Sequence, residues 1–150
     1  MARQSKLVQV SGTDATASKA GVSRAFETAY AALAWVFVLC VGYQVFLAGM
    51  AVFVDAINWV RHVSFVHYFE LIPVVMLIVA FVGKMPKGQG LYLRPTLLFV
   101  LVGLQYALAG SGRGVLAALH PVNALLIFWL AVAVATSIRP IRNGSGKVLM

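Results

Sequence analysis

Residues 29–54 read AYAALAWVFVLCVGYQVFLAGMAVFV and contain no charged side chain. A helix needs about 20 mainly apolar residues to cross the hydrocarbon core of a bilayer, so this stretch predicts a transmembrane helix. Three more apolar stretches, at about 64–83, 95–111 and 120–138, predict one spanning helix each. The sequence therefore predicts an all-α protein with four helices in the membrane.

The overall composition supports placement in a bilayer. Of the 150 residues, 61% are hydrophobic, and the mean hydropathy is +0.91. A soluble domain of this size could not bury so much apolar surface. We therefore expect an integral membrane protein in contact with lipid.

Basic residues flank the apolar stretches and predict the orientation of the chain. Twelve Lys and Arg stand against four Asp and Glu, and all the basic residues except Arg61 and Arg113 fall in the two tails or the central loop. Cytoplasmic loops carry such an excess, so both termini are predicted on the cytoplasmic side of the inner (plasma) membrane. A nucleic-acid binder would place its basic residues on a folded face among polar and aromatic ones, and no nucleic-acid partner is expected.

The chain divides into three segments. Residues 1–27 are rich in Ser, Thr, Ala and Gly and predict a flexible basic cytoplasmic tail. Residues 28–140 form the predicted transmembrane domain, and residues 141–150 form a second cytoplasmic tail. Cys40 is the only cysteine, so no intramolecular disulfide is expected. A membrane protein partner or a homo-oligomer remains open.

Two short motifs recur in matching helices. Residues 44–49 read QVFLAG in the first predicted helix, and residues 105–110 read QYALAG in the third. The second and fourth helices open with HYFE at 67–70 and HPVN at 120–123. Because the first and third helices run in the same direction, these matches predict a four-helix transmembrane bundle built from two parallel two-helix repeats.

The polar side chains within these helices predict a site. An amide buried in hydrocarbon is costly unless it is hydrogen-bonded, so the glutamines need partners. At ~1.5 Å per residue, polar groups from all four helices lie at similar depth in the outer half of the bilayer. We expect them to form one buried cofactor-binding cluster, made of Gln44, Gln105, His67, Glu70, His120 and Asn123. His62 is expected to be a solvated interfacial residue.

Haem b is the best-defined ligand hypothesis for this cluster. A single glutamate excludes a four-carboxylate di-iron site, and a zinc site would need three or four close ligands. His67 and His120 on parallel helices are predicted as the two axial metal ligands. Arg61, His62 and Arg113 in the outer loops could pair with propionates. Two alternatives remain: a cluster that only locks the helices together, or a path for protons or small solutes.

No hydrolase, kinase or transferase signature is present, so a non-enzymatic role is favoured, such as electron transfer or an accessory subunit. The Q-x-x-L-A-G pattern, the histidine of the second span and LHPVNALLIFWLAVA at 119–133 resemble DUF6220. That family consists of small four-span prokaryotic membrane proteins without an assigned function. More distantly, the placement of the histidines is similar to one half of the haem A synthase and b-type cytochrome bundles. These resemblances imply four spans and a haem-binding capacity.

Overall fold

A computed structural model describes residues 2–87 and 90–137, and the described part is helical without strands. Three of the helices contain stretches long and apolar enough to cross a membrane, at Gly21–Phe53, Leu93–Gly110 and Val115–Ser137, and one shorter helix is apolar. The helices are α1 (Ala2–Phe53), α2 (Asn58–Val66), α3 (Ile72–Val82), α4 (Leu93–Gly110) and α5 (Val115–Ser137).

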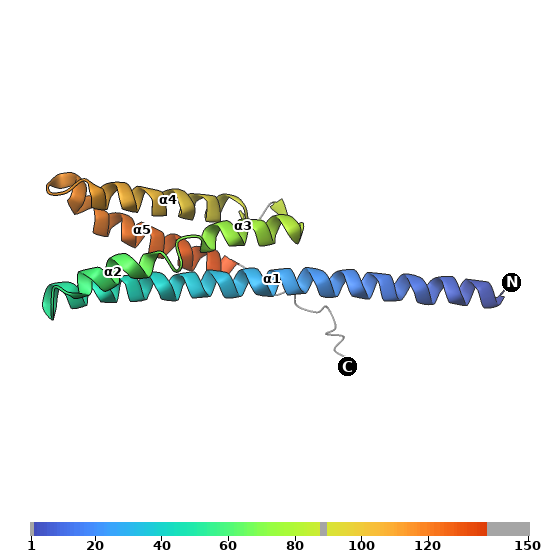
Figure 1. Cartoon of the computed structure of the whole chain (residues 1–150). Coiled ribbons are helices and arrows are strands. Elements are labelled where there is room, and N and C mark those ends of the chain that lie inside the picture. The colour runs from blue at the N-terminus through green and yellow to red at the C-terminus, as the bar shows by residue number, and fades with distance from the viewer. Residues whose placement is uncertain (1, 88–89, 138–150) are drawn as a thin grey trace, which may run out of the picture.

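The helices pack side by side, with α1 and α4 running in one direction and α2, α3 and α5 in the other (Figure 1). α1 packs against α2, α3 and α5, while α4 packs against α3 and α5. The α1–α2 and α4–α5 connections lie at one end, and the α3–α4 connection lies at the other (Figure 1). α2 and α3 therefore run back along α1 one after the other.

The structure corrects the second predicted helix. The continuous helix expected at about 64–83 is replaced by α2 and α3, with a turn at residues 67–71 between them. Pro73 lies in the first turn of α3. It has no N–H to donate, and its ring would clash with the carbonyl of Phe69 in a continuous helix, so regular helix stops before it. α2 also begins earlier than expected, which brings His62 into a helix.

The first and last predicted segments have different outcomes. α1 begins at Ala2, so the stretch that was predicted to be a flexible tail forms the first half of a long helix. No proline occurs in this stretch to interrupt helical hydrogen bonding. The division into tail and membrane domain stays a prediction, and the second tail, residues 141–150, lies outside the described residues.

Buried residues on α1 form a regular stripe. Tyr30, Ala34, Phe37 and Val41 are buried, and their three- and four-residue spacing places them on one face of the helix. Phe37 meets Phe69 edge to face, with ring centroids 5.7 Å apart. Gln44 continues the same spacing one turn beyond Val41. The apolar core thus leads directly into a polar region near the end that carries the α1–α2 and α4–α5 connections.

Candidate functional site

A reciprocal contact joins α1 to α2. The Gln44 side-chain Nε2 donates to the backbone oxygen of His62 at 2.8 Å, and the His62 Nδ1 lies 3.0 Å from the backbone oxygen of Gln44. Because a carbonyl can only accept, this Nδ1 carries the proton. We call this arrangement a Gln–His clasp: each side chain bonds the backbone of the other residue.

A second Gln–His clasp joins α4 to α5. Gln105 Nε2 donates to the backbone oxygen of His120 at 3.0 Å, and His120 Nδ1 lies 3.3 Å from the backbone oxygen of Gln105. The pairing of atoms is the same as in the first clasp. In both clasps Nδ1 is held by a carbonyl, and a neutral imidazole then presents Nε2 as its unprotonated nitrogen.

The two clasped histidines lie beside each other across the helices. Their ring centroids are 6.4 Å apart, and the ring planes are inclined by 58°. The Nδ1 contact that orients each ring is the kind of outer contact that fixes the tautomer and orientation of metal-binding histidines. His62 and His120 are therefore neighbouring rings, each oriented by a carbonyl oxygen at Nδ1.

A cavity of about 670 Å³ surrounds this pair. His62, His120 and both glutamines line it, together with mainly apolar side chains from α1, α2, α4 and α5. The wall of α5 includes Pro121, which cannot donate a helical hydrogen bond to the carbonyl of Ala117. A volume of this size is typical of small-molecule and cofactor sites, which are also largely apolar.

Asn123 makes the two halves of the cavity unequal. Its Nδ2 donates to the backbone oxygen of Leu101 at 2.9 Å and to Gln105 Oε1 at 2.5 Å. The corresponding place on α2, three residues after His62, is held by Phe65. Gln44 Oε1 is accordingly buried without a hydrogen-bond partner. A ligand with an O–H or N–H could satisfy this acceptor, because buried polar atoms otherwise lose hydrogen bonds that water would supply.

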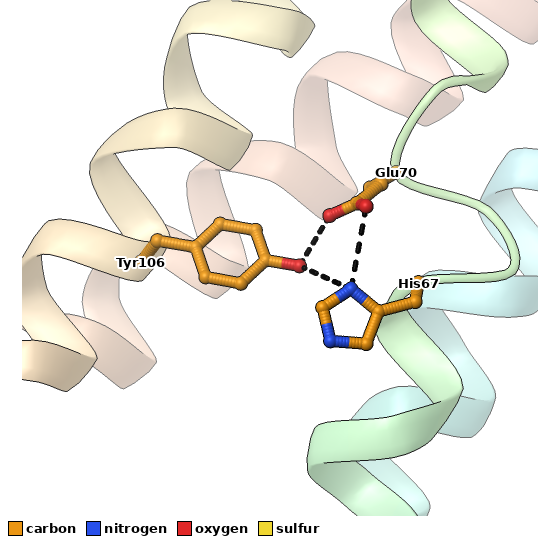
Figure 2. Close-up of polar contacts among 3 residues, drawn as sticks. All are labelled: His67, Glu70 and Tyr106. Atoms are coloured by element: carbon orange, nitrogen blue, oxygen red, sulfur yellow. Dashed lines mark hydrogen bonds and ion pairs between the residues drawn. The ribbon is translucent and has the colours of Figure 1, made fainter.

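A second polar group, which we call the surface triad, consists of His67, Glu70 and Tyr106. The Tyr106 hydroxyl donates to Glu70 Oε2 and lies 3.3 Å from His67 Nδ1. His67 Nδ1 also lies 3.3 Å from Glu70 Oε1. Figure 2 shows the three side chains closing a triangle between the α2–α3 turn and α4. The side chain of His67 is 59% exposed, so the triad lies on the outer surface of the protein.

The structure separates the residues that the sequence predicted to converge. Gln105, His120 and Asn123 lie together, and Gln44 lines the same cavity. His67 and Glu70 belong to the surface triad instead, so the histidine beside His120 is His62 rather than His67. The reason is the helix break before Pro73, which ends α2 at Val66 and places His67 in the turn.

Two residues of these sites were not predicted, namely His62 and Tyr106. His62 was expected to be solvated because α2 was expected to begin at about 64. With α2 beginning at Asn58 and α5 at Val115, His62 and His120 occupy the second turns of their helices. The sequence separation is 18 residues from Gln44 to His62 and 15 residues from Gln105 to His120. It is longer in the first pair because α1 extends further beyond Gln44 than α4 extends beyond Gln105. The similarity of these two separations was the available signal.

Among the side chains that the structure describes, within residues 21–87 and 90–137, no three His, Cys, Asp or Glu gather as a metal-binding group. Residues 44–112 match DUF6220, described as a family of unknown function. The match covers a little under half of the chain, from Gln44 through Gly112, and it supports the similarity to this family that the sequence motifs predicted. Comparison with curated proteins and with solved structures found no match.

Proposed function

We propose that the chain is a four-pass protein of the cytoplasmic membrane with both termini in the cytoplasm. α1, α4 and α5 have the length and apolar character for spanning. The fourth pass would be made by α2 and α3 together, which run consecutively along α1 (Figure 1). The two Gln–His clasps support a repeat of two helices, because each joins an odd-numbered pass to the next with the same atoms.

Cysteine labelling tests this orientation. In a Cys40→Ala background, Lys87→Cys lies in the α3–α4 connection and Arg113→Cys in the α4–α5 connection, both at exposed positions. A membrane-impermeant maleimide should label position 113 from outside intact cells and position 87 only after the cells are opened. Labelling of position 87 in intact cells would refute the proposed orientation.

We further infer that the cavity binds haem b, with His62 and His120 as axial ligands and electron transfer as the role. The observation that carries this inference is the closeness of the two rings, with both Nδ1 atoms occupied by carbonyl oxygens. An iron–nitrogen bond is ~2 Å long, and the nitrogen of an imidazole lies ~1 Å from the ring centroid. Two imidazoles on one iron would therefore have their centroids ~6 Å apart. The observed separation is 6.4 Å.

The chain's own residues would hold and orient the group. His62 and His120 would hold the iron through their ring nitrogens, and Gln44 and Gln105 keep the rings in place through their backbone oxygens. The walls of the cavity are mainly apolar, and electrostatic contacts are stronger in such low-dielectric surroundings than in water. Arg61 precedes His62 in the chain, donates to Asn58 Oδ1 at 2.9 Å and is a candidate partner for a propionate. Bound haem would supply one-electron chemistry, and the protein would act alone or as an accessory subunit.

An absorption spectrum tests the haem proposal. The full-length protein is purified in detergent from haem-supplied cells and titrated with haemin. A saturable Soret band is expected in the wild-type protein and in His67→Ala, which serves as the matched control because His67 lies outside the cavity. His62→Ala and His120→Ala should each lose the band or shift it as one axial ligand is removed.

Two results would refute haem binding at this pair. One is a colourless wild-type protein that does not bind haemin, which would favour the competing view that the clasps only join the helices. The other is a band that is unchanged in both His62→Ala and His120→Ala. Circular dichroism of each variant separates loss of the ligand from loss of the fold.

A further inference from the structure

The surface triad lies at a depth where ionisable groups are rare. Tyr106 is ~20 Å along α4 from Leu93, and Glu70 is ~18 Å from the Val82 end of α3, at ~1.5 Å per residue. The hydrocarbon core of a bilayer is about 30 Å thick. Two separate elements therefore place the triad well inside the hydrocarbon when the chain spans the membrane as proposed.

The exposure of the triad is the second unusual feature. Ionisable side chains within a membrane usually face the interior of the bundle or pair there, and they mark functional positions. The triad instead faces outward, since the side chain of His67 is 59% exposed and that of Glu70 is 26% exposed. Tyr106 is 42% exposed and also lines the cavity. The triad thus forms a polar rim between the cavity and the lipid.

One nitrogen of the triad is available to a ligand. Tyr106 donates its only proton to Glu70 Oε2. His67 Nδ1 lies within reach of oxygens of both Tyr106 and Glu70, so it is the other donor among the three contacts. The second ring nitrogen of His67 points away from the other two side chains (Figure 2). This Nε2 accepts a hydrogen bond when the imidazole is neutral and donates one when the imidazole is protonated.

The position and the chemistry together define the ligand. Only a molecule dissolved in the bilayer reaches the triad from the lipid side. A phosphate headgroup does not fit, because the Glu70 carboxylate would repel it. A hydroxyl donating to Nε2, or a carbonyl accepting from it, does fit. We propose that the surface triad binds the ring oxygen of a bilayer-soluble quinone or its hydroquinone.

The surroundings can accommodate the rest of such a molecule. Val63 and Val66 line the cavity on the α2 side, and Tyr106 lines it on the α4 side, so an apolar ring has aromatic and aliphatic contacts beside the triad. Leu71, 59% exposed, follows the triad along the chain and offers lipid-facing surface for an apolar tail. The proposal rests on the proposed membrane placement, and it does not depend on haem in the cavity.

Binding of a labelled quinone tests the proposal. Full-length protein in lipid nanodiscs is titrated with a tritiated benzoquinone carrying a decyl tail, and retention by empty nanodiscs is subtracted. The same titration uses its hydroquinone, and decylbenzene, which lacks ring oxygens, serves as a competitor. Variants are Tyr106→Phe, Glu70→Gln and His67→Ala. The matched control is Tyr68→Phe, because Tyr68 is 83% exposed on the same turn and outside the triad.

Saturable retention is expected in the wild-type protein and in Tyr68→Phe. The dissociation constant should rise about tenfold in each triad variant, since a hydrogen bond involving a charged network is lost. Glu70→Gln keeps the shape of the side chain, so it provides a reading if Tyr106→Phe fails to fold.

Three results would overturn the proposal: no saturable retention, equal affinity in the triad variants and Tyr68→Phe, or full competition by decylbenzene. Measuring quinone retention and haemin binding side by side in the wild-type protein separates the two proposals. Quinone retention without a Soret band would leave the triad site standing and remove the haem site, while the reverse pattern would remove the triad site alone.

Discussion

Asn123→Ala should loosen the contact between α4 and α5. The wild-type amide donates to Leu101 O at 2.9 Å and to Gln105 Oε1 at 2.5 Å, and Asn123 is only 4% exposed. Hydrogen bonds between membrane helices average about 0.6 kcal/mol each, so two of them contribute ~1.2 kcal/mol. Asn123 Oδ1 has no partner, and removing this buried acceptor offsets part of the loss. We therefore expect the free energy of unfolding to fall by about 1 kcal/mol.

The assay is reversible unfolding by SDS in mixed micelles, followed by circular dichroism. Val122→Ala is the control, because Val122 is a half-exposed neighbour on the same helix. A double-mutant cycle with Gln105→Ala should give a coupling energy of at least about 0.5 kcal/mol, since the two side chains share a hydrogen bond. Additive effects in the cycle, or equal stability of Asn123→Ala and Val122→Ala, would refute the reasoning.

Two further substitutions probe the opposite end of the molecule. Tyr30→Phe removes the hydroxyl that donates to Leu91 O at 2.8 Å in a fully buried position. It should lower the free energy of unfolding by about 1 kcal/mol in the same assay. An effect no larger than that of Tyr43→Phe, at a half-exposed tyrosine, would contradict this expectation. Gly83→Ala should destabilise the protein by about 1–3 kcal/mol, because its new Cβ would lie 2.7 Å from Phe26 Cβ and Cγ. The companion substitution Phe26→Ala should restore part of the loss. A stable Gly83→Ala protein would show that Phe26 moves freely.

Helix type and most helix positions were accessible from the sequence. Long apolar stretches have few alternatives to helix in a bilayer, since every backbone polar group must be bonded within the segment. This argument predicted the apolar part of α1, α4 and α5. It failed at the second predicted helix, where hydropathy continues through residues 64–83 although Pro73 interrupts the hydrogen bonding.

The candidate site was accessible only in part. The matching QVFLAG and QYALAG motifs pointed to Gln44 and Gln105, and both residues line the cavity. Asn123 and His120 were also placed with Gln105. The contact between His62 and His120 was missed, because the sequence match paired His67 with His120 by the residues that follow them. Which histidines meet depends instead on how far each helical hairpin extends before the chain turns back.

The sequence by itself determined that the chain is apolar and helical, because composition and the length of an apolar stretch depend only on the residues and their order. The tertiary structure decided which polar residues meet. A helix places neighbouring turns on one face, but the rotation and offset of one helix against another follow from packing across the whole interface. Thus packing put His62 beside His120, and the break before Pro73 turned His67 and Glu70 outward to Tyr106.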